Sequence, residues 1–215
     1  MAQPPIVPRE VQIGGLRLEG LLRLPAEPRA LIVFAHGSGS SRLSPRNTFV
    51  AVELGRQGLG TLLFDLLTEA ESADRRNVFD IALLGARVLE AVEWVAQSEL
   101  VSALPLGLFG ASTGAAAALV AAAERPAAVG AVVSRGGRPD LAGPALGRVR
   151  APTLLIVGGD DAGVIELNED AAAELACEHS VAIVPGATHL FEEPGALEEV
   201  VELAGNWFLR HLAAR

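Results

Sequence analysis

The chain has 215 residues, a formal net charge of −9 and a single cysteine. This length fits one domain with a substantial core, so we expect residues 1–215 to form a single domain. The lone Cys177 excludes internal disulfides and supplies no thiolate cluster for zinc or iron–sulfur binding, so we expect no metal. Acidity and dispersed arginines also disfavour nucleic acid as a partner, because phosphate binding relies on clustered positive charge.

The apolar segments are too short for a membrane protein. None approaches the ~18 uninterrupted apolar residues of a membrane span. Residues 1–10 carry three prolines and lack the apolar region of a secretory signal. We therefore expect a cytoplasmic location and no membrane partner, while the sequence leaves the oligomeric state undefined.

The predicted elements begin with a hairpin and continue as alternating strands and helices. Residues 11–13 and 16–24 alternate apolar and polar side chains around Gly14-Gly15, which indicates two antiparallel strands. Short continuous apolar runs then predict strands that are covered on both faces, at residues 30–35, 61–64, 104–109, 129–133, 153–157 and 181–184. Apolar residues at helical spacing predict helices near residues 47–57, 78–97, 115–124, 164–177 and 195–212, whereas residues 68–76 are expected to be a charged, solvated connection.

This alternation predicts an α/β fold. We expect a mostly parallel sheet of about eight strands with helices on both faces and an antiparallel hairpin at its start. Ligands of such sheets bind beyond the carboxyl ends of the strands, so functional residues should directly follow strands.

The sequence Gly110-Ala111-Ser112-Thr113-Gly114 lies between an apolar run and an alanine-rich segment. The pattern indicates a nucleophile elbow, in which a strand turns abruptly into a helix and holds a serine exposed. The two glycines remove Cβ atoms that would collide around the turn. Ser112 is therefore the candidate nucleophile, and the backbone N–H of Thr113 is a candidate donor to an oxyanion.

Three further groups of residues follow predicted strands. After residue 35 comes a small-residue loop, His36 to Ser41, in which the N–H of Ser38 is the second candidate oxyanion donor and His36 braces the loop. After residue 157 come Asp160 and Asp161, of which we favour Asp161 as the triad acid, with a helix N-cap as the structural alternative. After residue 184 comes His189, the candidate general base.

Serine, acid and histidine, each after a strand, occur in the chain order of α/β-hydrolases. The chain resembles that superfamily over nearly its whole length and is similar to the lidless hydrolases grouped with dienelactone hydrolases. The resemblance implies hydrolysis of esters or lactones without a cofactor, by a Ser112–His189–Asp161 triad. True dienelactone hydrolases characteristically use a cysteine nucleophile where this chain has Ser112.

The segment between residues 133 and 153 holds only a short helical stretch, where many relatives insert a lid. We therefore expect no large lid and an open site that accepts compact acyl groups of small-molecule esters. Arg135 and Arg138 follow a strand and are candidate ligands for a substrate carboxylate, with Arg42 and Arg46 in the neighbouring loop as further candidates. Their structural alternative is pairing with Asp65, Glu69 or Asp140.

The sequence leaves other functions open besides ester hydrolysis. A thioesterase or acyltransferase would share the triad, and a non-catalytic binding protein would share the fold. The glycine turn around Ser112 also resembles that of short-chain dehydrogenases. That class is excluded because the chain has no tyrosine and all seventeen basic residues are arginine, so the tyrosine and lysine pair is missing.

Overall fold

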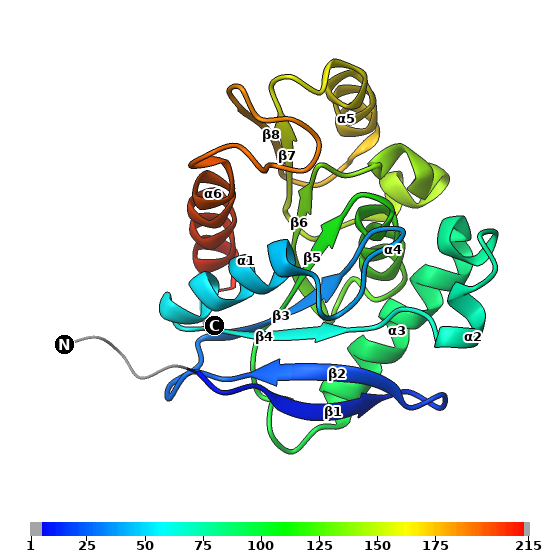
Figure 1. The fold of residues 1–215 in the computed structure, drawn as a ribbon, viewed down its shortest axis with the longest axis vertical. Helices are drawn as coiled ribbons and strands as arrows, with labels where there is room; N and C mark the ends of the chain where they lie inside the picture. The colour runs from blue at the N-terminus through cyan, green and yellow to red at the C-terminus, as the bar shows by residue number, and fades with distance from the viewer. Residues whose placement is uncertain (1–5, 213–215) are drawn as a thin grey trace.

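An eight-stranded sheet runs through the computed structural model, which describes residues 6–212 (Figure 1). The strand order is β1-β2-β4-β3-β5-β6-β7-β8, with β1, β2 and β4 paired antiparallel and all later neighbours parallel. The expected fold class, including the antiparallel hairpin at the start, is confirmed. The strands are β1 (Arg9–Ile13), β2 (Leu18–Arg23), β3 (Ala30–Ala35), β4 (Leu59–Phe64), β5 (Leu106–Ala111), β6 (Val129–Arg135), β7 (Thr153–Gly158) and β8 (His179–Val184).

Helices cover both faces of the sheet and create two apolar cores. α1 (Pro45–Arg56) and α6 (Ala196–His211) pack on one face. The other face is covered by α3 (Ile81–Gln97), α4 (Thr113–Glu124) and α5 (Ala162–Glu174). Both layers bury the apolar stripes that the sequence periodicity indicated.

The strands β3, β4, β5 and β7 are buried along their whole length, as continuous apolar runs predict. The same expectation is wrong for β8. This strand lies at the edge of the sheet, where His179 and Ser180 are exposed and Ile183 is 41% exposed. An edge strand has one open side, so its apolar residues need not be covered.

The charged segment after β4 is also more ordered than expected. Residues 69–72 form the short helix α2 (Glu69–Ser72), followed by the 3-10 helix η1 (Asn77–Phe79). Thr68 and Glu71 form a reciprocal capping box, in which the Thr68 hydroxyl accepts from the Glu71 N–H and the Glu71 carboxylate accepts from the Thr68 N–H. The polar residues of this segment suggested a solvated loop, but two of them, Thr68 and Glu71, form the helix cap.

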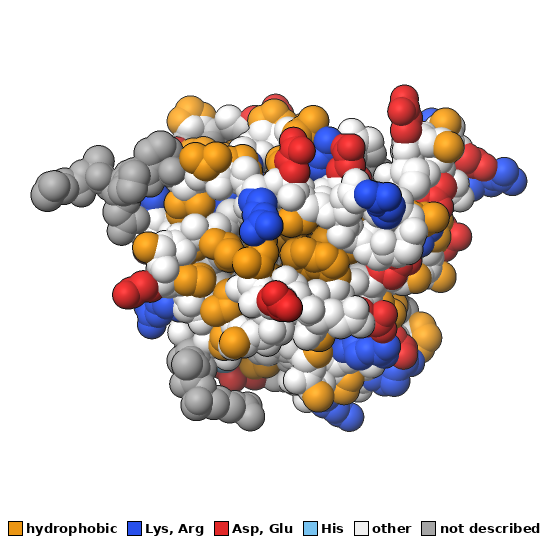
Figure 2. Space-filling view, turned by 90° about the horizontal axis from the view of Figure 1, so that it is seen from below, with side chains coloured by type: hydrophobic (Ala, Val, Ile, Leu, Met, Phe, Trp, Pro, Cys, Tyr) orange, Lys and Arg blue, Asp and Glu red, His pale blue; other side chains and the backbone are white. Residues whose placement is uncertain are grey.

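The segment between β6 and β7 contains only the 3-10 helix η2 (Pro139–Arg148), so no large lid is inserted there. Within residues 6–212, no helix combines the length and apolar character needed to cross a membrane. Figure 2 views the molecule from below, and on this face Arg side chains are interspersed with Asp and Glu rather than gathered into one patch.

Gly110 and Gly114 allow the first turn of α4 to pack closely against β3 and β5. A Cβ atom added at Gly110 would lie 2.4 Å from the Ala115 Cα atom. One added at Gly114 would lie 2.2 Å from the Ala35 carbonyl oxygen, at the end of β3. Both obstacles are backbone atoms, which cannot move aside like a flexible side chain. The first turn of α4 is therefore locked against β3 and β5.

We predict that Gly114→Ala lowers the free energy of unfolding by about 1–3 kcal/mol or more, because the new methyl group overpacks this contact. The matched control is Gly163→Ala in α5, where an added Cβ meets no atom within 4 Å. That change should be neutral or stabilising by about 0.5–1 kcal/mol. Urea unfolding of both variants checks the contrast, and equal stabilities would contradict the packing account.

Candidate active site

Ser112 sits at the turn between β5 and α4 in a conformation that L-residues rarely adopt. Its φ of 50° and ψ of −123° depart from both strand and helix values. Such strain persists only where the surrounding structure fixes it, here through the packed glycines on either side. The residue is half-buried, and because it directly follows β5 it lies at the carboxyl edge of the sheet. This geometry is that of a nucleophile elbow.

Both candidate oxyanion donors lie next to this serine. The Ser38 N–H donates to the Thr113 Oγ1 atom over 3.1 Å, which ties the loop after β3 to the first turn of α4. The Thr113 N–H belongs to that first turn, where amides have no partner within the helix. A Cβ added at Gly37 would lie 3.6 Å from the Ser112 Oγ atom, so the loop passes directly beside the hydroxyl.

A histidine and a carboxylate meet after β7 and β8. The His189 Nδ1 atom lies 2.7 Å from the Asp161 Oδ2 atom. Because a carboxylate only accepts hydrogen bonds, Nδ1 is the donor to Asp161, and Nε2 is the ring nitrogen left outside this pair. Asp161 also occupies the N-cap position of α5, yet its side chain makes no cap hydrogen bond. Asp160 is exposed, and no described histidine binds it.

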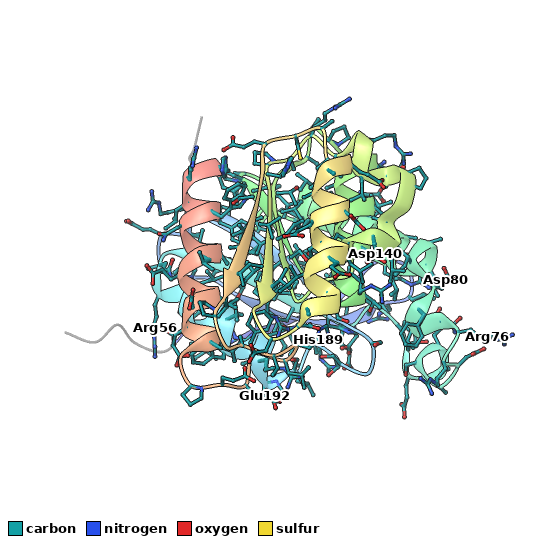
Figure 3. The ribbon with its side chains drawn as sticks, turned by 90° about the horizontal axis from the view of Figure 1, so that it is seen from above. Arg56, Arg76, Asp80, Asp140, His189 and Glu192 are labelled. Atoms are coloured by element: carbon teal, nitrogen blue, oxygen red, sulfur yellow. The ribbon has the colours of Figure 1, made fainter. Side chains whose placement is uncertain are left out.

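The residue that follows β6 connects the two halves of the site. The Ser112 N–H donates to the Arg135 carbonyl over 3.4 Å, and Gly136 comes next in the chain. A Cβ added at Gly136 would lie 3.0 Å from the His189 carbonyl oxygen and 3.8 Å from its Cε1 atom. Ser112 and His189 therefore border the same stretch of backbone. Figure 3 shows His189 and Glu192 on the loops at one end of the strands, between α5 and α6.

Among the described side chains, no hydrogen bond joins Ser112 Oγ to His189. Catalytic hydrogen bonds are often long in enzymes without substrate and tighten in the productive complex.

His36 joins the oxyanion loop to the end of β4. Its Nε2 atom accepts from the Leu66 N–H over 3.1 Å, so its Nδ1 atom is the donor to the Gly37 carbonyl at 3.0 Å. Burial lowers the pKa of His36, although the Gly37 carbonyl and the Asp65 carboxylate act in the opposite direction. His36 is thus a neutral brace for its loop.

Arg135 is 7% exposed and lies beneath the loop that carries His189. Its Nη2 atom donates to Asn47 Oδ1 over 3.1 Å, and its guanidinium carbon lies 5.7 Å from the ring centre of Phe191. Its Nε atom is enclosed with no partner among the described residues. Burial, aided by the charge of Arg46, lowers the pKa of Arg135 to about 10. The contacts hold α1 to the His189 loop, and a role in substrate binding stays a prediction.

Arg138 makes the pairing expected of a structural residue. Its Nε and Nη2 atoms each donate over 2.8 Å to one oxygen of Asp140. This bidentate pair occupies the face of the guanidinium that would bind a substrate carboxylate. We therefore leave Arg138 out of the proposed substrate site.

A cavity of about 660 Å³ opens beside the oxyanion loop. It borders Ser38 and Thr113, and its remaining walls come from the β1–β2 hairpin, the ends of β3 and β4, and the segment from α2 to α3. Neither Arg135 nor Arg138 lines it. Within residues 6–212, no three His, Cys, Asp or Glu side chains are grouped so as to hold a metal ion.

The sequence profile of the Dienelactone hydrolase family matches residues 19–208. The chain belongs to this family. The match includes the serine elbow, both aspartates and His189, and family membership supports a hydrolase.

The curated relatives are longer than this chain. Two proteins from strains of Mycobacterium tuberculosis are each 56% identical to it over 213 residues, which is 98% of this chain and 48% of theirs. Both carry the name "Putative phosphoribosyl transferase". The chain thus spans about half the length of the curated relatives it matches.

Solved structures show the same fold. A dienelactone hydrolase from Anabaena variabilis has a TM-score of 0.93 and 52% identity, with 98% of this chain and all of that chain covered. The protein Est1E from Butyrivibrio proteoclasticus has a TM-score of 0.79 at 16% identity, with 95% and 98% covered. The second likeness is evidence for the fold alone.

The sequence marked Arg42 as a candidate ligand for a substrate carboxylate but did not predict the acidic partners that it has in the cavity wall. Arg42 bonds Asp65 through its backbone N–H at 2.7 Å and through its side chain, and it also pairs with Glu19. These residues come from β2, the loop after β3 and the end of β4. Only the antiparallel pairing of β2 with β4 brings them together, and no local pattern encodes that pairing.

We predict that His36 makes stability depend on pH. Because its folded-state pKa lies below the ordinary 6.5, the unfolded chain binds more protons as the pH falls past that value. The stabilisation is complete above 6.5 and is lost as the pH drops from there through the lower, folded-state pKa. Urea unfolding between about pH 8 and pH 5 should show a shallower decline for His36→Gln than for the wild type. Parallel declines would contradict a neutral His36.

Proposed function

We propose that the protein is a serine hydrolase that cleaves carboxylic esters or lactones of small, compact acyl substrates through an acyl-enzyme at Ser112. The observation that carries the proposal is the 2.7 Å contact between His189 and Asp161, at the same end of the sheet as the strained serine. Membership of a hydrolase family agrees with this chemistry.

The first half of the proposed reaction forms the acyl-enzyme. Ser112 Oγ attacks the substrate carbonyl carbon while His189 Nε2 takes the hydroxyl proton. The carbonyl oxygen becomes an anion that the Thr113 N–H stabilises. The Ser38 N–H joins it as second donor by exchanging its present acceptor, Thr113 Oγ1, for the anion. As the intermediate collapses, the bond to the leaving oxygen breaks and His189 donates its proton to that oxygen, which releases the alcohol.

The second half repeats these steps with water. A water molecule attacks the acyl carbon and gives a proton to His189, and the bond to Ser112 Oγ then breaks as the oxygen regains its proton. Asp161 holds the imidazole in the required tautomer throughout and stabilises its cation. An alcohol or thiol in place of water would give acyl transfer on the same triad.

The M. tuberculosis proteins are named for a transferase activity, which differs from the hydrolysis that we propose for this chain. About half of each of those proteins lies outside the match to this chain. We infer that the name refers to that other half, and we assign hydrolysis to the part that resembles this chain.

Substitution of the triad tests the proposal. We expect Ser112→Ala to lower kcat for an aryl acetate by about 10⁶-fold. Asp161→Asn should lower it by about 10³ to 10⁴-fold, because the imidazole is then held in the wrong tautomer.

The control for Asp161 is its neighbour: Asp160→Asn should change kcat little, because that side chain is exposed. Steady-state kinetics on the purified variants decide the matter. Turnover retained by Ser112→Ala would overturn the proposal, and a large loss for Asp160→Asn alone would reassign the acid.

A further inference from the structure

We infer that the cavity beside the oxyanion loop is the acyl pocket, and that it accepts an uncharged, largely apolar acyl group. The inference rests on the proposed esterase function and identifies which part of the ester this cavity selects. It is carried by the placement of the cavity relative to His189 and by the chemistry of its walls.

The strand order separates the cavity from the acid–base pair. Asp161 and His189 follow β7 and β8, at one edge of the sheet. The cavity lies over β2, β4 and β3, towards the opposite edge. Ser112 follows β5, which lies between the two groups. Figure 1 shows the same separation, with β7 and β8 at the top and the β1–β2 hairpin at the bottom.

The proposed mechanism then determines where the alcohol portion and the acyl portion of the ester lie. His189 must reach the leaving oxygen to protonate it, so the alcohol portion lies towards β7 and β8. The carbonyl oxygen faces the N–H groups of Ser38 and Thr113, which border the cavity. The remaining substituent of the carbonyl carbon is the acyl chain, and it extends from these donors into the cavity.

Six apolar side chains line the cavity beside its polar and charged residues. Two of them, Leu66 and Leu84, are buried in the core, with Leu84 3% exposed and Leu66 fully buried. Apolar lining at this volume is typical of pockets for small molecules. The apolar residues that line it are Leu16, Leu18, Leu66, Leu67, Val78 and Leu84.

The charged residues of the cavity disfavour an acyl group that carries a carboxylate. Its lining holds the carboxylates of Glu19, Asp65 and Glu69 but only the guanidiniums of Arg17 and Arg42. Arg42 already pairs with Glu19 and Asp65, so its charge is neutralised. Arg17 donates to Gln12 Oε1 on the exposed hairpin. That amide is neutral, so Arg17 keeps its charge, but the lining as a whole still holds three carboxylates against two guanidiniums. An added carboxylate would therefore enter a cavity with an excess of acidic groups.

The outer wall of the cavity is fixed in place. The capping box of α2 holds Thr68 and Glu71 together, and the Glu71 Oε1 atom pairs with Arg87 on α3 at 2.8 Å. The Asn77 side chain donates to the Glu71 carbonyl over 2.9 Å, which ties η1 to the same wall. Val78 is therefore presented to the cavity by a braced segment, and it is the residue we expect to limit acyl size.

Val78→Trp tests this assignment with two series of esters. One series varies the acyl group from acetyl to phenylacetyl on a constant p-nitrophenyl leaving group, and the other varies the alcohol on a constant acetyl group. We expect the variant to lower the ratio of kcat/KM for phenylacetyl over acetyl esters by about 10- to 100-fold. The ranking of alcohols should stay as in the wild type.

The matched control is Val52→Trp, an equally large change at an exposed position on α1, which should leave both rankings unchanged. Leu84→Ala provides a second variant, and it should raise the phenylacetyl to acetyl ratio by enlarging the base. A change in the alcohol ranking, with an unchanged acyl ranking, would overturn the inference and make the cavity a leaving-group site. A wild type that hydrolyses no ester would instead refute the proposed function itself.

The charge of the acyl group is tested with p-nitrophenyl esters of succinate and of its methyl ester, which differ in one carboxylate. The wild type should favour the neutral substrate by about tenfold in kcat/KM, and Glu69→Gln should narrow this preference. Glu166→Gln on α5, outside the cavity, is the control and should leave the preference intact. Equal or faster turnover of the carboxylate substrate by the wild type would contradict an uncharged acyl group.

Discussion

The site depends on one backbone constraint, the positive φ angle of Ser112 between two closely packed glycines. Gly110 lets the first turn of α4 approach β5, and Gly114 lets it approach the end of β3. With both contacts made, the chain has no relaxed path around the corner, and the serine adopts the strained conformation. The same packing sets the Thr113 N–H at the start of a helix beside the hydroxyl. The positions of the candidate nucleophile and of one candidate oxyanion donor therefore follow from a single packing arrangement.

The strand order places the acid–base pair on one side of Ser112 and the cavity on the other. The candidate acid and base follow β7 and β8. Most of the cavity lining follows β3 and β4 or belongs to the hairpin that pairs with them, and Thr113 adds to it from the start of α4. Buried polar groups brace each side: His36 bridges two loops on the cavity side, and Arg135 joins α1 to the loop that carries His189. Neither brace has a carboxylate among its hydrogen-bond partners, so each holds its loop while adding no ion pair to the site.

Local signals predicted the fold and the positions of the candidate triad. Apolar runs mark the strands and glycines mark the turns that follow them. Ser112 and His189 could therefore be assigned to strand ends without knowing any long-range contact. The choice between Asp160 and Asp161 depended on which carboxylate faces the imidazole, a fact that only the meeting of two loops determines. The exposure of β8 and the helix α2 differ from the simplest interpretation of composition, whereas the Arg138–Asp140 pair is the structural alternative that the sequence had left open. The cavity forms through long-range strand pairing, and no local sequence pattern predicts that pairing.

The central claim is that the hydroxyl of Ser112 is an activated nucleophile. Labelling the native protein with a fluorophosphonate, followed by peptide mapping, tests this most directly, because the reagent bonds covalently to activated serines and leaves ordinary hydroxyls unmodified. The account predicts one modified residue, Ser112, and loss of labelling when His189 is replaced by alanine. A native protein that takes up no label, or that is labelled at another serine, would contradict it.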